Sequence, residues 1–148
     1  MLTSTGGVGK LGIFNPLIFT LGYTSTRPDE LKQIATDKGA FVLDIRLVRW
    51  SRAPQWREGA LASLLTWDVY RICDLLGNVN YKGGPIELKD PGLGVKLVLS
   101  LLAQKPVILL CACWSHETCH RLVAANLVAG STIGCEIEHL YGSRKEGR

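Results

Sequence analysis

Reactive side chains are concentrated in one short stretch of the chain, between residues 111 and 121. The stretch follows an apolar run, Val107 to Cys111, and leads into a helical pattern that ends at Gly130. Its reactive members are thiols, imidazoles and one guanidinium group: Cys111, Cys113, His116, Cys119, His120 and Arg121. Cysteine next to histidine is used in proteins both for covalent catalysis and for binding metal ions. The stretch therefore predicts where the chemistry takes place, but it leaves the reaction open.

The cysteines of this stretch have three possible roles. Cys111 ends a strand opposite a helix N-terminus, which lowers a thiol pKa, so it is a candidate nucleophile with His120 or His116 as its base. Zinc binding is the second role, but Cys119 and His120 diverge by about 100° on a helix, so we predict no metal and no cofactor. In the third interpretation Cys111 and Cys119 are small buried packing residues.

Two groups of residues favour an anionic ligand. Ser115 is the predicted N-cap of the last long helix, whose free N–H groups attract anions, and Arg121 offers a bidentate fork to phosphate or carboxylate. Arg121 could instead have a structural role, paired with Asp44 or with a carbonyl at the end of a strand. The second group is an arginine loop at residues 46–57, which contains Arg46, Arg49, Arg52 and Arg57.

Two tryptophans alternate with the arginines of this loop. Trp50 and Trp56 favour stacking on nucleic-acid bases, because aromatic side chains are the usual platforms for bases. Either tryptophan could instead fill the core beneath the loop, and the arginines could belong to a solvated surface.

Strands and helices alternate along the chain and must position these residues. Apolar runs predict strands at 17–23, 41–43, 69–75, 107–111 and 135–140, the last at an edge of the sheet. Helices are predicted from a Thr26–Asp29 capping box to Lys38, from about Pro54 to Leu65, and over 95–104 and 115–130, with a long loop at 78–94. This order predicts a single three-layer α/β domain, Rossmann-like, with a mostly parallel sheet of about five strands and helices on both faces.

The carboxyl ends of parallel strands meet at one edge of the sheet, where ligands bind in such folds. Residues that follow three different strands should therefore form one pocket. For catalysis the candidates are Cys111, His120 and Asp44. For ligand binding they are Tyr23, Ser25, Arg46, Arg49, Arg52, Ser115 and Arg121.

Four motifs in this order resemble the uncharacterised family known as domain of unknown function 488. They are Leu21-Gly22-Tyr23-Thr24-Ser25, Asp44-Ile45-Arg46, the basic segment Ser51 to Leu61 with Pro54 and Trp56, and Cys119-His120-Arg121 after an apolar strand. The resemblance covers roughly residues 18 to 140. It implies a fold and a site, and the family's name records that no activity is settled.

Composition limits the remaining choices. A chain of 148 residues with 47% hydrophobic and 20% charged residues fits one folded domain, which we place at 16–142 between a flexible extension at 1–15 and a frayed, charged tail at 143–148. The net charge of +4 permits an acidic partner without requiring one. Five cysteines, three of them close together, favour a reducing compartment, hence the cytoplasm, and no apolar run is long enough for a membrane helix.

The glycine-rich segment Gly6 to Lys10 is not a phosphate-binding loop, because Leu11 stands where a serine or threonine is needed and no strand precedes it. Together these features predict that the protein binds or acts on a phosphate-bearing small molecule or nucleic acid, with a cysteine nucleophile as one candidate means of catalysis. A non-catalytic nucleic-acid-binding module that uses the arginine loop is the first alternative. A Cys/His metal protein is the second, and the oligomeric state is left open.

Overall fold

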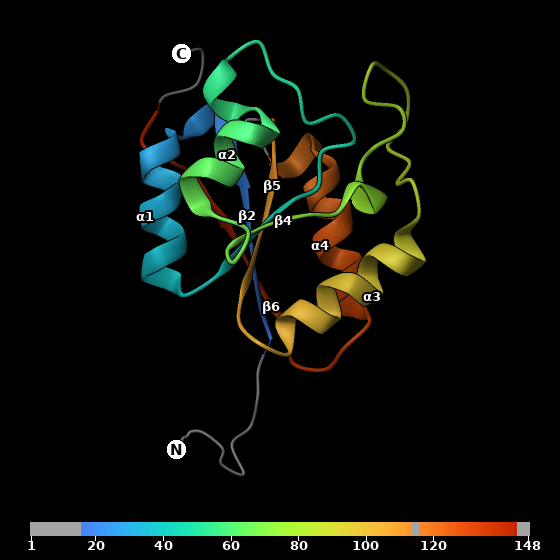
Figure 1. Ribbon diagram of the computed structural model, residues 1–148. Helices are drawn as coiled ribbons and strands as arrows, with labels where there is room; N and C mark the ends of the chain where they lie inside the picture. Colours follow the sequence, from blue (N-terminus) through green and yellow to red (C-terminus); the bar gives the residue numbers. More distant parts are fainter. Residues whose placement is uncertain (1–15, 114–115, 145–148) are drawn as a thin grey trace, which may run out of the picture.

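A parallel five-stranded sheet forms the centre of the protein, as seen in a computed structural model that describes residues 16–113 and 116–144 (Figure 1). Its strands lie in the order β4-β3-β5-β2-β6, and every neighbouring pair is parallel. Their bounds are β2 Leu17–Gly22, β3 Phe41–Asp44, β4 Tyr70–Ile72, β5 Val107–Cys111 and β6 Glu136–Leu140. The three central strands are the ones whose ends carry the candidate site residues.

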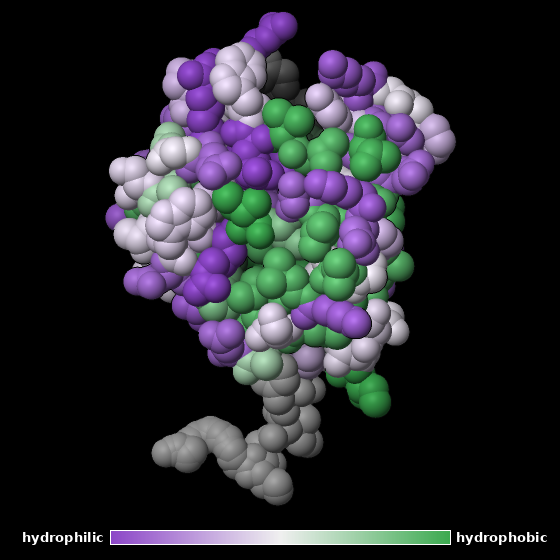
Figure 2. All heavy atoms as spheres, turned by 45° about the vertical axis from the view of Figure 1, so that its right-hand side comes forward, coloured by the Kyte–Doolittle hydropathy of each residue, from purple (hydrophilic) through white to green (hydrophobic). Residues whose placement is uncertain are grey.

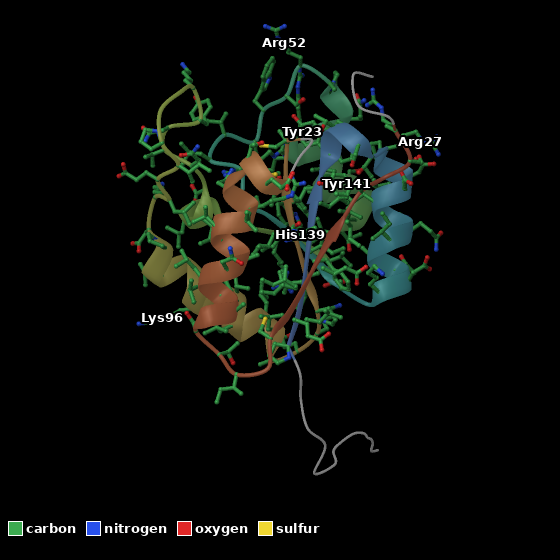
Figure 3. The ribbon with its side chains drawn as sticks, turned by 180° about the vertical axis from the view of Figure 1, so that it is seen from behind. Tyr23, Arg27, Arg52, Lys96, His139 and Tyr141 are labelled. Atoms are coloured by element: carbon green, nitrogen blue, oxygen red, sulfur yellow. The ribbon has the colours of Figure 1, made fainter. Side chains whose placement is uncertain are left out.

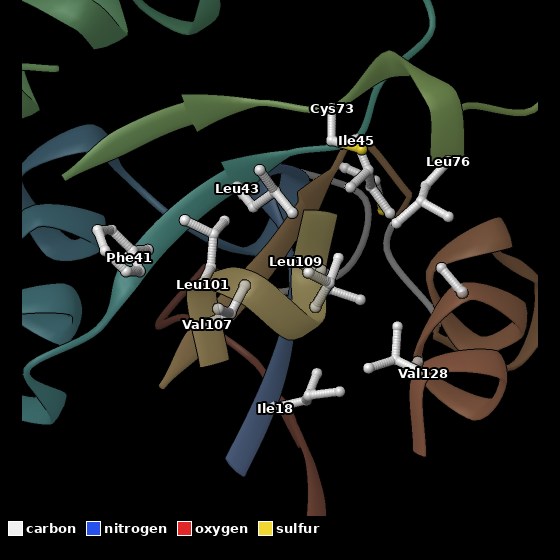
Figure 4. Packing of buried hydrophobic residues seen from close by; sticks show 14 of the residues in the cluster. Ile18, Phe41, Leu43, Ile45, Cys73, Leu76, Leu101, Val107, Leu109 and Val128 are labelled. Carbon is white, nitrogen blue, oxygen red and sulfur yellow. The ribbon is translucent and has the colours of Figure 1, made fainter. Parts of the chain in front are cut away.

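Helices cover both faces of this sheet, which confirms the three-layer α/β domain predicted from the sequence (Figure 1). Helices α1 (Pro28–Lys38) and α2 (Glu58–Leu65) pack on one face, and α3 (Pro91–Leu102) and α4 (His120–Gly130) pack on the other. Figure 4 shows the second interface, where Leu43 and Leu109 of the sheet lie with Leu101 of α3 and Val128 of α4. Burial of these apolar faces is the main force that holds the layers together.

The path of the chain opens a crevice at the carboxyl edge of the sheet. Strands β2 and β3 lead into α1 and α2 on one face, whereas β5, which lies between them, leads into α4 on the other. Loops that leave neighbouring strands toward opposite faces separate from each other, and ligands bind in the gap. The fold thus places a binding position at the end of β5.

The first helix begins one residue later than the capping box predicts. Its N-cap is Arg27, and Thr26 is buried, with its hydroxyl 3.3 Å from the carbonyl oxygen of Gly22. The capping-box prediction is therefore wrong, because the end of β2 offers the Thr26 hydroxyl a buried acceptor. The predicted stop is confirmed, since Gly39 has the left-handed φ of 57°.

The last two helices also begin at other residues than expected. Helix α3 starts at Pro91 rather than Val95, because Asp90 caps it by accepting a hydrogen bond from the Leu93 N–H at 3.2 Å. Helix α4 starts at His120 rather than Ser115, and its N-cap is Cys119. The predicted third strand is shorter, with β4 ending at Ile72 and a 3-10 turn at Asp74–Leu76.

Helices α3 and α4 expose part of their apolar surface (Figure 2). The exposed residues are Leu93 and Leu97 on α3 and Val123 and Leu127 on α4. Within the described part of the chain, no helix has the length and apolar character required to cross a bilayer. The carboxyl edge, by contrast, is rich in polar and charged groups, so a charged ligand is better accommodated there.

Candidate functional site

A pocket of about 660 Å³ lies at the carboxyl edge of the sheet. It is lined by residues that follow β2, β3 and β5, by the start of α4 and by the loop after the Asp74–Leu76 turn. Among its lining residues are Tyr23, Arg46, Trp50, Lys82, Cys119 and His120. Motifs far apart in the sequence thus meet at one place, as the parallel-sheet argument predicts.

Asp44 and Arg46 form a buried ion pair at the end of β3. The Arg46 guanidinium donates from Nε to Asp44 Oδ1 at 2.9 Å and from Nη2 to Oδ2 at 2.6 Å. Tyr70 of β4 donates its hydroxyl to the same Oδ2 at 2.6 Å. Burial, followed by the negative charge of Asp44, raises the pKa of Tyr70 far above its usual value. The Asp44 carboxylate therefore accepts hydrogen bonds at both oxygens and holds Arg46, which fits the positioning role among the two, proton transfer or positioning, that we predicted for it.

Arg46 has one donor left over. Its Nη1 atom is buried and has no hydrogen-bond partner in the described part of the chain, while the residue is 5% exposed and lines the pocket. The guanidinium lies over the Tyr23 ring at 5.3 Å. Although burial alone works against the charged form, the hydrogen bond to Asp44 and its charge raise the pKa of Arg46. Arg46 is thus a fixed cation at the pocket wall.

Arg121, the second residue of α4, is fully buried beneath the pocket. Its Nη1 donates to the carbonyl oxygen of Cys113 at 2.9 Å and to the sulfur of Cys111 at 3.2 Å. Gly22 makes room for this contact, since a Cβ there would lie 1.6 Å from the Cys113 oxygen and 2.8 Å from Arg121 Nη1. Arg121 therefore binds a carbonyl just after the end of β5, as one form of the structural alternative expects, and it also contacts the sulfur of Cys111.

The sulfur atoms of Cys111, Cys113 and Cys119 lie within 4.8 Å of one another, and those of Cys111 and Cys119 are 2.9 Å apart. Burial, followed by hydrogen bonds with the other two thiols, raises the pKa of Cys111, contrary to our expectation of a lowered value. Hydrogen bonds from Cys111 and then Cys113 lower the pKa of Cys119. Cys111 does not line the pocket, whereas Cys113 and Cys119 do. Cys113 and Cys119 are thus the cluster cysteines that line the pocket, and Cys111 and Cys119 are buried, as the packing interpretation expects.

His120 is held in a defined orientation beside Cys119. Its Nε2 is 3.2 Å from the carbonyl oxygen of Ile45, and its Nδ1 is 3.7 Å from the sulfur of Cys119. A carbonyl can only accept, so Nε2 is the donor in the contact with Ile45, and Nδ1 faces the sulfur of Cys119. The predicted Cys-His contact therefore exists, with Cys119 in place of Cys111.

The arginine loop is mostly engaged with its own neighbourhood. Arg49 pairs with Glu58 at 2.8 Å, and Arg57 lies over the Trp50 ring at 4.6 Å. Neither Arg49 nor Arg52 lines the pocket, and Figure 3 shows Arg52 at the outer end of the loop, beyond Tyr23. Of the predicted ligand-binding residues in this loop, the structure brings only Arg46 to the pocket.

The two tryptophans of the loop have different surroundings. Trp56 is 1% exposed and stacks on Tyr23 with ring centroids 4.8 Å apart, so it fills the core. Trp50 is 60% exposed and lines the pocket. Only Trp50 is accessible as a stacking platform.

Of the two predicted serines, Ser25 is described by the structure, and it does not line the pocket. Ser25 is fully buried, donates to the Gly22 carbonyl at 3.0 Å and accepts from the Gly142 N–H at 3.0 Å. It therefore joins the end of β2 to the segment after β6. Ser115 lies outside the described residues, and α4 begins at His120, so the prediction that Ser115 caps this helix is wrong.

The loop at residues 78–86 supplies a wall of the pocket that the sequence did not identify as part of the site. Asn78 shapes it, because its side-chain oxygen accepts from the N–H groups of Asn80 and Glu87, both at 3.0 Å. Tyr81 and Lys82 line the pocket from this side. Only the length of the loop gave a signal, since long loops in compact domains are often functional.

The segment after β6 is also held in place where the tail was expected to begin. The Ser143 N–H donates to the Glu30 carboxylate at 3.1 Å, and the Arg144 N–H donates to the Ser25 carbonyl at 2.9 Å. Residues 1–15 and 145–148 lie outside the described part. The first two residues of the predicted tail are thus anchored to α1 and to the turn that follows β2.

Comparisons with family models, curated proteins and solved structures return no match for this chain. The functional argument therefore depends on the geometry of the site.

Proposed function

We propose that the pocket binds a phosphate-bearing ligand, a nucleotide or a nucleic-acid phosphate, with Arg46 as the anchor. The observation that carries this proposal is that Arg46, which lines the pocket, has a buried Nη1 without a hydrogen-bond partner in the described part of the chain. A buried donor without an acceptor costs about 1 to 3 kcal/mol, and more when the group is charged. A phosphate oxygen would remove that cost and form a short, charge-assisted hydrogen bond.

Aromatic groups beside Arg46 favour a nucleotide over a simple phosphate. Trp50 exposes 60% of its surface and lines the pocket, and Arg57 supports its ring from one side. Tyr81 is 54% exposed at the opposite wall. Stacking of a base on an aromatic ring contributes about 1 to 3 kcal/mol. A ligand with both a base and a phosphate would use both features.

Binding of adenosine monophosphate, compared with adenosine and inorganic phosphate, tests the proposal. Calorimetry on the full chain should give measurable affinity for the nucleotide. Arg46→Lys should weaken it at least tenfold, because lysine cannot hold Asp44 with a fork and also reach the ligand. The matched control is Arg27→Lys, which alters an exposed arginine that is paired only with Asp29 and does not line the pocket.

The proposal fails if a folded Arg46→Lys protein, with an unchanged melting temperature, binds the nucleotide as tightly as the parent does. Retained binding of adenosine alone with no preference for the monophosphate would contradict the anchoring role of Arg46 while leaving Trp50 in place.

Salt dependence distinguishes this proposal from the alternative, a nucleic-acid-binding module that uses the whole arginine loop. Arg49 and Arg57 are engaged with Glu58 and Trp50, so few loop arginines are available to neutralise phosphates. Affinity for a single-stranded oligonucleotide should then fall only gently with salt, since the slope reports the number of phosphates contacted. A steep salt dependence would favour the module.

A further inference from the structure

The three clustered cysteines and His120 suggest a second site, in the wall of the ligand pocket, which Cys113, Cys119 and His120 line. Their sulfur atoms come from the end of β5, from two residues beyond it and from the N-cap of α4. The sequence argument against a metal placed Cys119 on a helix, from which it would diverge. Cys119 instead has the extended conformation φ −109°, ψ 149°, because the helix starts at His120, the residue after it. Its side chain can therefore turn back toward Cys111.

We propose that Cys111, Cys113, Cys119 and His120 form a binding site for a zinc ion. Three thiols and one imidazole are a usual zinc donor set. In a tetrahedral zinc site, ligand atoms about 2.0 to 2.3 Å from the ion lie about 3.5 to 3.8 Å from one another. The 3.7 Å between Cys119 Sγ and His120 Nδ1 matches this spacing.

The orientation of His120 fits a ligand role. A metal-binding histidine normally donates its other ring N–H to a carbonyl or carboxylate, which fixes the ring and the tautomer. His120 has this arrangement, with Nε2 3.2 Å from the Ile45 carbonyl and Nδ1 directed at the sulfur. The lone pair of Nδ1 is thus presented to the position where the ion would lie.

Arg121 supplies the charge balance. Three thiolates and one divalent ion carry a net charge of −1, which is costly to bury without a cation. The buried Arg121 guanidinium donates to the sulfur of Cys111 at 3.2 Å. Hydrogen bonds of this kind to ligand atoms orient them and tune the metal. Binding requires two adjustments: the 2.9 Å between Cys111 and Cys119 must widen by about 0.8 Å, and His120, which is not among the ligand atoms within 4.8 Å of one another, must move closer to the other sulfurs.

Elemental analysis of the full chain, purified without chelator and reconstituted with zinc, tests this inference. We expect about one zinc per chain in the parent protein. Separate Cys111→Ser, Cys113→Ser and Cys119→Ser variants should each lose at least tenfold in affinity. The matched controls are Cys73→Ser and Cys135→Ser, because these two free cysteines lie outside the cluster and should leave binding unchanged.

Cobalt substitution provides a readout that misfolding cannot imitate. The intensity of the sulfur-to-cobalt charge-transfer band should correspond to three thiolates in the parent. His120→Asn should keep this intensity, since it keeps the three cysteines, but should bind cobalt more weakly. Each variant of the three cluster cysteines that still folds should show two. The control variants should give the parent spectrum.

Two outcomes would overturn the inference: less than about a tenth of a zinc per chain after reconstitution of folded protein, or equal losses in the control cysteine variants. Rapid alkylation of Cys119 that zinc does not slow would also overturn it and would favour a nucleophilic thiol. The inference does not depend on the phosphate proposal. Arg46→Lys should reduce nucleotide binding and retain zinc, so the failure of either proposal can be told from the failure of the other.

Discussion

Two arginines are buried at the same edge of the sheet, and they are held in different ways. Arg46 is fixed by the two carboxylate oxygens of Asp44, which is itself held by Tyr70. The contacts of Arg121 include softer acceptors, the sulfur of Cys111 and the carbonyl oxygen of Cys113. The first arrangement is a bidentate fork between full charges, and the strength of the contact between Arg121 and Cys111 depends on how much negative charge the sulfur carries.

This difference assigns the two arginines different tasks. The fork occupies Nε and Nη2 of Arg46, which leaves Nη1 at the pocket wall for a ligand. Arg121 directs Nη1 at Cys111 and Cys113, so it acts on the sulfur cluster. A strong pair to a carboxylate fixes a cation that can bind an anion, whereas a cation beside thiols stabilises thiolates.

The largest effect should come from removing the carboxylate. Asp44→Asn keeps the shape of the side chain but leaves Arg46 buried without its counter-charge, which costs about 3 to 5 kcal/mol. Denaturant unfolding measures the loss. Asp29→Asn is the control, because the Arg27–Asp29 pair is exposed and contributes less than about 1 kcal/mol. Equal losses in the two variants would show that Arg46 does not depend on Asp44.

A somewhat smaller effect should follow from closing the space beside Arg121. In Gly22→Ala the new methyl group would lie 1.6 Å from the Cys113 oxygen, so β2 and the segment after β5 must separate. We expect a loss of about 3 kcal/mol in the free energy of unfolding. Gly59→Ala in α2 meets nothing within 4 Å and should stabilise the protein slightly.

Gly22→Ala also tests whether the two arginines act independently. Because Arg46 lies on the other side of β5, nucleotide binding should survive Gly22→Ala at temperatures where the protein is folded, while zinc binding should weaken. Loss of both functions together would show that the two arginines act as one unit.

Much of the fold could be predicted from the sequence because its signals are local. Apolar runs such as Val107 to Cys111 are long enough to mark buried strands, and Gly39 and Pro106 fix the ends of neighbouring elements. The meeting of Tyr23, Arg46 and His120 followed from one rule about parallel sheets. That rule needs only that the strands be parallel and close to each other, which the order β3-β5-β2 satisfies.

The details of the site were not predictable because they depend on where one helix begins. A start at Ser115 would place Cys119 and His120 on the helix, and a start at His120 places Cys119 before it. Helix boundaries shift by a few residues for reasons of tertiary packing that a single sequence does not display. Such contacts bring together the sulfurs of Cys111, Cys113 and Cys119. They also pair Arg49 with Glu58.

The loss of stability on removing the Tyr70 hydroxyl, which supports the Asp44–Arg46 pair, should be intermediate in size. Tyr70→Phe removes the hydroxyl that donates to Asp44 Oδ2, which should cost about 1 to 3 kcal/mol in unfolding free energy at neutral pH. Tyr81→Phe, at an exposed tyrosine, is the control and should change stability little.

The stability difference between Tyr70→Phe and the parent should also depend on pH in the alkaline range. The pKa of Tyr70 is raised in the folded protein, first by burial and then by the charge of Asp44, from the usual value of 10.0. Its contribution is therefore fully present below pH 10 and declines above it, by about 1.4 kcal/mol per pH unit, because the unfolded chain releases the proton first. A difference between parent and variant that stays constant from pH 9 to pH 11 would contradict this.

The smallest expected effect concerns Arg49, which tests whether the arginine loop is structural. Glu58→Gln removes the charge that holds Arg49 at 2.8 Å, in a pair that is partly exposed, so the loss of stability should be below about 1 kcal/mol. Arg49 also donates to the Arg46 carbonyl at 3.3 Å, a contact that the variant retains. Nucleotide affinity should therefore stay within twofold of the parent in calorimetry. A tenfold gain in nucleotide affinity, with a steeper salt dependence, would mean that the released Arg49 reaches the phosphate. The arginine loop would then be a binding element and not a structural one.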